Sequence, residues 1–223
     1  MRRESRSDTR PHQRPLPPIQ HPEQVDSPID RFILARLERE GLSLSDQAGP
    51  RMLVRRLYLD LIGLLPTPAQ VDEFLKTQSQ PDSYANLVDR LLDSPHYGER
   101  WGRQWLDVVG YSDSNGYIRH DSPRPSAWHY RDYVIQSLNQ DKPYDQFWLE
   151  QLAGDELVNY SATPHLSADD LNRLIATHYL RNEPDGTDNT EGNEITRVME
   201  RYAVLESQLQ ITMSSMFGIT IDC

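Results

Sequence analysis

Two neighbouring segments hold the residue types that could do chemistry. In the first, SPHYGERWGRQWLD, the aromatic residues Tyr97, Trp101 and Trp105 recur every four positions, so on a helix they form one wall. One interpretation is that His96 and Arg100 line a ligand pocket floored by the tryptophans. The alternative is an aromatic stripe packed into the core, with exposed ion pairs on the opposite side of the helix.

The second segment, residues 111–125, is rich in polar and aromatic side chains and has no helical or strand period. It carries Asp113, Asn115 and His120, and Trp128 follows closely. Aromatic rings can stack on the C–H faces of a sugar while carboxylates and amides bind its hydroxyls, so this loop is a candidate carbohydrate site. The alternative is that Asp113 and Asn115 build an Asx turn ahead of the following glycine.

Neither a metal site nor a catalytic centre is recognisable from spacing. The seven histidines form no H-E-x-x-H pattern, no C-x-x-C occurs, and His178 shares a helix face with apolar residues, which predicts a satisfied core histidine. The acidic stretch 185–194 is predicted to be a solvated turn rather than a calcium loop. A hydrolase using Asp113, His120 or Asp155 is the least favoured alternative, because no nucleophile–base pair accompanies them.

Charge excludes some partners. The chain has 23 basic and 34 acidic residues, a net charge of −11, although residues 1–20 carry five arginines against two acidic residues. So acidic a body repels nucleic acid and anionic membrane surfaces. No apolar run approaches the ~18 residues of a membrane-spanning helix, and residues 1–20 lack the apolar region of a signal peptide. The single cysteine allows no intrachain disulfide.

These residues must be positioned by helices. Residues 1–26 are rich in Arg, Pro and Gln, which predicts a disordered leader or linker, and residues 27–223 are predicted to form one multi-helix, all-α domain of about eight or nine helices. The capping patterns start helices at Ser27, Pro50, Thr67, Asp82 or Ser83, Pro95, Ser126, Pro143, Ser167 and Glu194. The last helix is predicted to be long, about 194–217, with one apolar stripe formed by Ile195, Val198, Tyr202, Leu205, Leu209 and Met216.

Several segments in register resemble a known family. They are IDRFILARLEREGL, RRLYLDLIGLLPTPAQVDEFL, LVDRLLDSPHYGERWGRQWLD, YSDSNGY, RPSAWHYRDYVI, NQDKPYDQF, EQLAGDEL and LIATHYLRN. Over roughly residues 28–223 the chain resembles the second of the planctomycete-type cytochrome c domains, a family without a settled biochemical role. Ile118 and His129 depart from the polar residues expected at their positions.

The resemblance implies a cofactor and a setting. In the family a segment like GITIDC leads into C-x-x-C-H, the pattern of c-type haem attachment, so Cys223 looks like the first thiol of an incomplete motif. We therefore expect haem c in the complete protein and none in this chain. The resemblance further implies an exported, periplasmic or extracytoplasmic, multidomain protein in which a cytochrome c module of the same polypeptide is the partner and the work is electron transfer. The alternative function is an extracytoplasmic carbohydrate- or matrix-binding domain.

Overall fold

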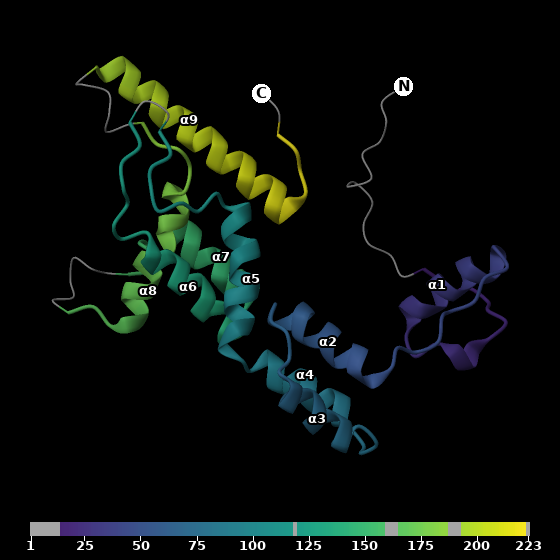
Figure 1. Cartoon of the computed structure of the whole chain (residues 1–223). Coiled ribbons are helices and arrows are strands. Elements are labelled where there is room, and N and C mark those ends of the chain that lie inside the picture. The colour runs from purple at the N-terminus through teal and green to yellow at the C-terminus, as the bar shows by residue number, and fades with distance from the viewer. Residues whose placement is uncertain (1–13, 118–119, 159–164, 187–192, 222–223) are drawn as a thin grey trace, which may run out of the picture. The chain divides into compact units, whose positions relative to one another are not determined.

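The chain is built from α-helices. A computed structural model describes residues 14–117, 120–158, 165–186 and 193–221. Among these it contains nine α-helices and no strand beyond a single bridge between Ser114 and Pro123, which confirms the all-α prediction (Figure 1). The helices are α1 (Pro28–Arg39), α2 (Pro50–Leu61), α3 (Pro68–Thr77), α4 (Ser83–Leu92), α5 (Pro95–Val108), α6 (Trp128–Asn139), α7 (Tyr144–Ala153), α8 (Ala168–Ala176) and α9 (Glu194–Thr212). Short turns of other helix types are η2 (Pro22–Gln24), η3 (Thr177–Arg181) and η5 (Met213–Phe217).

The chain divides into two compact units, residues 1–49 and 50–223. The first half of the predicted leader lies outside the described residues, and its second half contains only η2 before α1 begins. In α1, the Ser27 hydroxyl accepts from the backbone N–H of Asp30, and the Asp30 carboxylate accepts from Ser27. The Ser27 hydroxyl also donates to the Asp30 carboxylate at 2.8 Å, and this bond, together with that from the Ser27 N–H, lowers the pKa of Asp30. The predicted capping box therefore sets where α1 starts.

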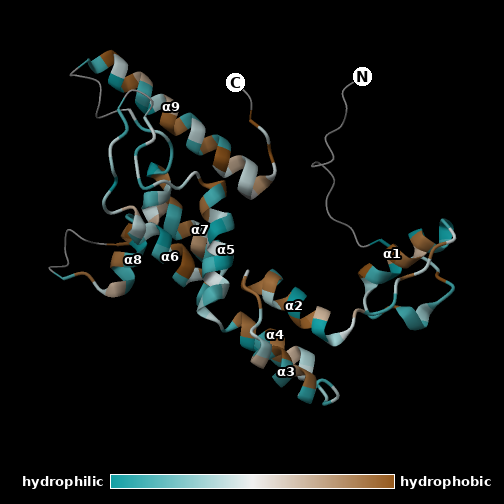
Figure 2. Ribbon diagram, viewed as in Figure 1, coloured by the Kyte–Doolittle hydropathy of each residue, from teal (hydrophilic) through white to brown (hydrophobic). Residues whose placement is uncertain are grey.

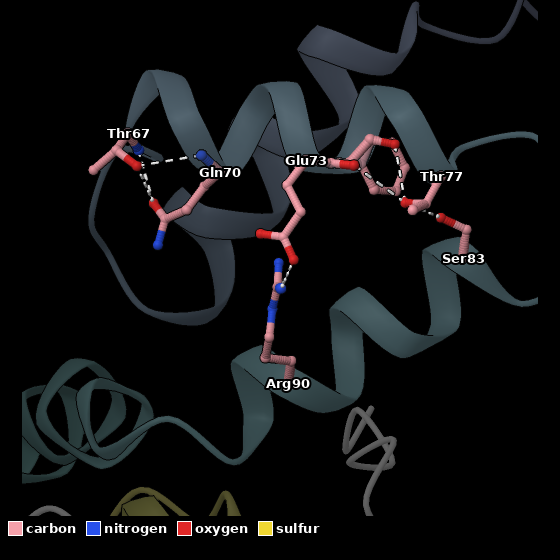
Figure 3. A network of polar contacts seen from close by, with 7 residues as sticks. Thr67, Gln70, Glu73, Thr77, Ser83 and Arg90 are labelled. Carbon is pink, nitrogen blue, oxygen red and sulfur yellow. Dashed lines mark hydrogen bonds and ion pairs between the residues drawn. The ribbon is translucent and has the colours of Figure 1, made fainter.

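In the second unit, α2, α3 and α4 share one small core. Its buried residues are Val54, Tyr58, Ile62, Phe74, Leu87 and Leu91. Polar contacts hold the rim of this core (Figure 3): the Thr67 capping box starts α3, Arg90 of α4 pairs with Glu73 of α3 at 3.0 Å, and the Ser83 hydroxyl donates to Thr77. Each of the three helices thus turns part of its apolar residues inward, whereas Tyr84 and Leu92 of α4 remain 47% and 39% exposed.

Helices α5 to α8 and η3 enclose a second, aromatic core. Its buried residues are Val109, Tyr130, Tyr133, Val134, Phe147, Trp148, Ala176 and Tyr179. Helices α5 and α6 approach closely because α5 has glycine at the crossing: a Cβ on Gly98 would lie 2.4 Å from the Ile135 carbonyl oxygen. Helix α5 serves both cores, since Tyr97 packs against the small core and Trp105 against the aromatic core.

Two predicted details of the helices change. Helix α6 starts after Ala127 instead of Ser126, and no side chain caps its first turn; the Ser126 carbonyl accepts from His129 N–H instead. The predicted last helix does run from Glu194 to Phe217, but its last five residues form the wider π turn η5 instead of α-helix, and Gly218 ends it in a left-handed conformation (φ 61°). No helix among the described residues is long and apolar enough to cross a membrane.

Candidate functional site

The polar loop, residues 111–125, is held by its own backbone and by one amide side chain. The Asn115 N–H donates to the Ser122 carbonyl at 2.9 Å, next to the bridge between Ser114 and Pro123. The Asn115 side-chain oxygen accepts from the N–H groups of Tyr117 (3.1 Å) and Ser122 (3.0 Å). Asn115 therefore makes the Asx turn that the sequence offered as the alternative, and its oxygen is already occupied by the loop.

Asp113 is tied to the start of the same loop. Its side-chain oxygen accepts a 2.7 Å hydrogen bond from the Tyr111 hydroxyl, and its backbone carbonyl accepts from Arg124 N–H. Burial, with a contribution from the hydrogen bond and charge of Asp113, raises the pKa of Tyr111 to about 12. The Tyr111 hydroxyl consequently stays protonated and orients the Asp113 carboxylate, which is exposed on the loop surface.

The loop is clamped from outside by the segment that follows η3. The Arg124 guanidinium donates to the backbone carbonyls of Asn182 (3.4 Å) and Glu183 (2.9 Å), and Asp185 N–H donates to the Asn115 carbonyl. The Tyr117 ring packs on Gly186, where an added Cβ would lie 2.3 Å from a ring carbon. Burial lowers the pKa of Arg124. These polar residues therefore hold the loop in one conformation.

A tryptophan groove of about 470 Å³ lies beside α5. The residues that line it are Tyr97, Trp101, Gln104, Trp105 and Val108 of α5, Leu138 of α6, and Ser214 and Ser215 of η5. The indole N–H of Trp101 donates to the Leu61 carbonyl at 3.2 Å. That of Trp105 lies 3.1 Å from the Tyr130 hydroxyl and 3.2 Å from the Gln151 side-chain oxygen. Because both N–H groups are bonded away from the groove, the tryptophans offer it their apolar faces.

The remaining predicted pocket residues do not line this groove. His96 pairs with Glu99 through a 2.8 Å contact on the exposed first turn of α5. The stem of Arg100 packs over Gly63, the left-handed residue after α2, where an added Cβ would lie 2.8 Å from the arginine Cδ. His96 directly precedes Tyr97 and Arg100 directly precedes Trp101 in the sequence, so each side chain leaves α5 about 100° around the helix from its groove-lining neighbour.

Trp128 and His120 also lie outside the groove lining. Trp128 is 45% exposed at the start of α6, and its ring contacts the ring of His129 at a centroid separation of 3.6 Å and an interplanar angle of 33°. His120 is exposed, and its backbone N–H donates to the Tyr117 carbonyl. Cys223 lies outside the described residues. The structure thus brings Trp101 and Trp105 together in a groove, and Asp113 and Asn115 together in a loop.

His178 departs from the satisfied core histidine that its spacing predicts. Its Nε2 atom is buried and finds no hydrogen-bond partner among the described residues. Burial, reinforced by the charges of Arg124 and Arg181, lowers the pKa of His178 to about 4, so the ring is neutral at pH 7. It borders a hollow of about 280 Å³ that Ser126 and His129 also line. The sequence spacing predicts the apolar neighbours of His178, but it does not predict that Arg124 and Arg181 lie close enough to lower the pKa of its ring.

The structure contains a buried charge network that the sequence analysis does not predict. Glu150 of α7 is 4% exposed, accepts a 2.8 Å hydrogen bond from the Tyr133 hydroxyl and pairs with Lys142. The Lys142 ammonium lies 4.7 Å from the centroid of the Tyr133 ring. Burial and the bond to Glu150 raise the pKa of Tyr133. The one clue in the sequence is that Glu150 directly follows three apolar residues of α7, Phe147, Trp148 and Leu149.

The donors present do not fit a covalently held haem. Two thioethers need C-x-x-C-H, and the sequence contains one cysteine and no such motif. Among the described residues, no group of three or more His, Cys, Asp or Glu side chains is placed to hold a metal ion. The residues that line the tryptophan groove are aromatic or aliphatic apart from the amide of Gln104 and the hydroxyls of Tyr97, Ser214 and Ser215, and none of them is a histidine or cysteine.

Residues 28–223 match the model of a family described as PSCyt2, a protein of unknown function (DUF1549). No curated protein and no solved structure matches the chain.

Proposed function

The chain belongs to the PSCyt2 family (DUF1549), and on that premise we propose that it is a helical scaffold domain serving c-type cytochrome electron transfer in an exported multidomain protein. We take the haem of this proposal to be that of a cytochrome c module of the same polypeptide, the partner that the family resemblance implies. The role of this chain is to bind and orient that module.

The tryptophan groove is the observation that carries the proposal. Its indole N–H groups are bonded inward, so burying the groove under a partner leaves no indole donor unpaired. Electron-transfer partners associate through small surfaces, below about 1,200 Å² in total, so that they can separate again. A shallow apolar groove with Gln104, Ser214 and Ser215 among its lining suits such a contact.

Charge supports the same partner class. The net charge of −11 attracts a basic protein over a distance and accelerates its encounter with the groove. The chain therefore combines long-range attraction for a cationic module with a short-range apolar surface, on which the exposed edge of a haem can pack.

A basic mitochondrial-type ferric cytochrome c is a usable probe, titrated into the full chain by calorimetry. We expect saturable binding that weakens as salt is raised, because screening removes the attraction. Trp101→Ala should weaken binding about tenfold by removing roughly 1.4 kcal/mol of contact. Trp128→Ala, equally exposed but outside the groove, is the matched control. Absence of binding, or equal affinity in the two variants, would overturn the proposal.

Carbohydrate binding is the second candidate, and the groove favours it at one point. The exposed face of Trp101 stands near the side-chain amide of Gln104 and the hydroxyls of Ser214 and Ser215, a combination that could take the C–H face and the hydroxyls of a sugar. A glycan panel read by tryptophan fluorescence tests this. A shift lost in Trp101→Ala and kept in Trp128→Ala would support a sugar in the groove, whereas silence across the panel would count against it.

A further inference from the structure

Helix α9 carries its apolar side outward. Ile195 is 75% exposed, Tyr202 69%, Leu205 54% and Leu209 52%, while Gln208 is its one buried residue among those described. Hydrophobic and hydrophilic residues both colour the length of α9 (Figure 2). A surface helix of a globular protein normally turns its apolar stripe to the core, whereas α9 turns its apolar stripe to solvent.

Hydrogen bonds attach the opposite, polar side of α9 to the rest of the second unit. The Tyr117 hydroxyl donates to Glu200 at 3.3 Å, the Ser207 hydroxyl donates to Glu183 at 2.6 Å, and the hydroxyls of Tyr179 and Thr212 lie 2.7 Å apart. These contacts fix which face of α9 looks at the domain. The opposite, apolar face is therefore held toward solvent by the fold and is available to a partner.

The apolar face has the spacing of a coiled coil. Its residues are Ile195, Val198, Tyr202, Leu205 and Leu209, separated by alternating steps of three and four. That 3.5-residue repeat keeps one seam facing a second helix as the two wind around each other. Met199, which is 67% exposed, widens the apolar surface beside this seam. The spacing suits a second helix as the occupant, and the charges that flank the seam identify that helix.

We propose that α9 pairs in parallel with α9 of a second copy of this chain. In that register Arg201 stands opposite Glu206 of the second copy, and two-fold symmetry repeats the attraction on the other side of the seam. Both side chains are exposed, and neither enters an ion pair among the described residues. In the antiparallel register Arg201 would instead face Gln208, and Glu206 would face Met199, so no opposite charges meet.

The five-residue seam is sufficient for pairing because the fold already holds α9 in its helical form. Isolated helices of this length are marginal in water, but α9 is already held in place by its polar contacts with the domain. Pairing then loses little conformational freedom, so most of the free energy gained by burying apolar surface goes into association. Because only five seam positions take part, we expect a dissociation constant in the micromolar range.

Sedimentation equilibrium of the full chain, from low micromolar to near-millimolar concentration, tests the pairing. The wild-type chain should pass from monomer to dimer across this range. Leu205→Asn should weaken dimerisation at least about tenfold, since about 1.4 kcal/mol of seam burial is lost. Leu171→Asn on α8 is the matched control, because that leucine is 51% exposed and outside the seam.

Charge exchange tests the orientation. Arg201→Glu and Glu206→Arg should each weaken the dimer, because like charges then face each other, and the double variant should restore it. A monomer at every concentration would overturn the proposal, as would equal loss in the α8 control. Loss in Leu205→Asn with no response to either charge change would replace it by antiparallel pairing. Binding of a monomeric chain to phosphatidylcholine vesicles, lost in Leu205→Asn, would assign the face to a lipid surface instead.

Discussion

Helices α6 and α9 use amphipathic sequences in opposite ways. Helix α6 buries Tyr130, Tyr133 and Val134 in the aromatic core, whereas the apolar residues of α9, such as Tyr202 and Leu205, face solvent. A periodic stripe therefore predicts a helix and an apolar contact surface, but it does not say whether the contact lies within the same chain. What distinguishes the two helices is the polar side, which in α9 finds specific partners on the domain.

The polar groups of the two regions also differ. In the aromatic core, the Tyr130 hydroxyl donates to Gln151 at 2.6 Å and Tyr133 is bonded to Glu150, while the indole N–H of Trp148 has no partner among the described residues. Under α9, both polar side-chain atoms of the buried Gln208 lack a partner among the described residues. Buried unpaired amides cost free energy, so α9 is expected to open at a lower free energy than α6. Four predictions test this contrast.

The largest effect is expected at Glu150. Its replacement by alanine leaves the Lys142 ammonium, whose side chain is 16% exposed, without its carboxylate, and the Tyr133 hydroxyl without its acceptor. Breaking a buried ion pair from one side costs about 3–5 kcal/mol of unfolding free energy. Urea denaturation measures this change. At a dilute concentration, where the chain is a monomer, Glu206→Ala on exposed α9 should leave the midpoint nearly unchanged, and equal shifts in the two variants would abolish the contrast.

Next comes the crossing of α5 and α6. Gly98→Ala would place a Cβ 2.4 Å from the Ile135 carbonyl oxygen, so the helices must separate. Overpacking of this kind costs about 1–3 kcal/mol. Gly102→Ala should cost less, because its Cβ would meet the Ile135 side chain at 3.2 Å. Thermal unfolding of both variants should rank them in that order, and the reverse order would contradict the close crossing described here.

A smaller effect concerns pH. The pKa of His178 is lowered to about 4, below its ordinary value of 6.5, so the unfolded chain binds the proton more readily than the folded one. This contribution to stability is complete above pH 6.5 and is lost as pH falls toward 4. After a discount for partial exposure it amounts to about 1–2 kcal/mol. His178→Gln should show a correspondingly shallower acid loss in urea denaturation, and an unchanged slope would refute the assignment.

The smallest effect is expected on α9 itself. Leu205 is 54% exposed and belongs to neither core, so Leu205→Asn should change the unfolding free energy by less than about 0.5 kcal/mol at dilute concentration. Chemical denaturation below the dimerisation range measures it. A loss comparable to that of Gly98→Ala would mean that the apolar face of α9 is packed within its own chain.

Much of the fold could be predicted because local rules determine it. Ser27 and Thr67 start their helices through capping boxes, and the all-α class follows from helical periods throughout the sequence. The start of α6 was misplaced because Ser126 has the residue type of a cap but lies one residue early. Local patterns cannot decide such a case when tertiary packing against α5 positions the helix.

The candidate site could be predicted only in part. The four-residue spacing of Trp101 and Trp105 indicated one aromatic wall, and they do line one groove. The contribution of Ser214 and Ser215 could not be foreseen, since it depends on where the chain returns after more than a hundred residues. The same holds for Arg124, whose clamp on the backbone after η3 links segments distant in sequence.

Helix α5 contributes Tyr97 to the small core and Trp105 to the aromatic core, so it belongs to both. If either core unfolds, α5 loses the packing at one of its ends, and this destabilises the core at its other end. The cores should therefore melt in a single calorimetric transition, and the amide protons at the centre of α5 should be among the last to exchange with solvent. A substitution in the groove that loosens α5 should therefore lower the stability of both cores of the second unit.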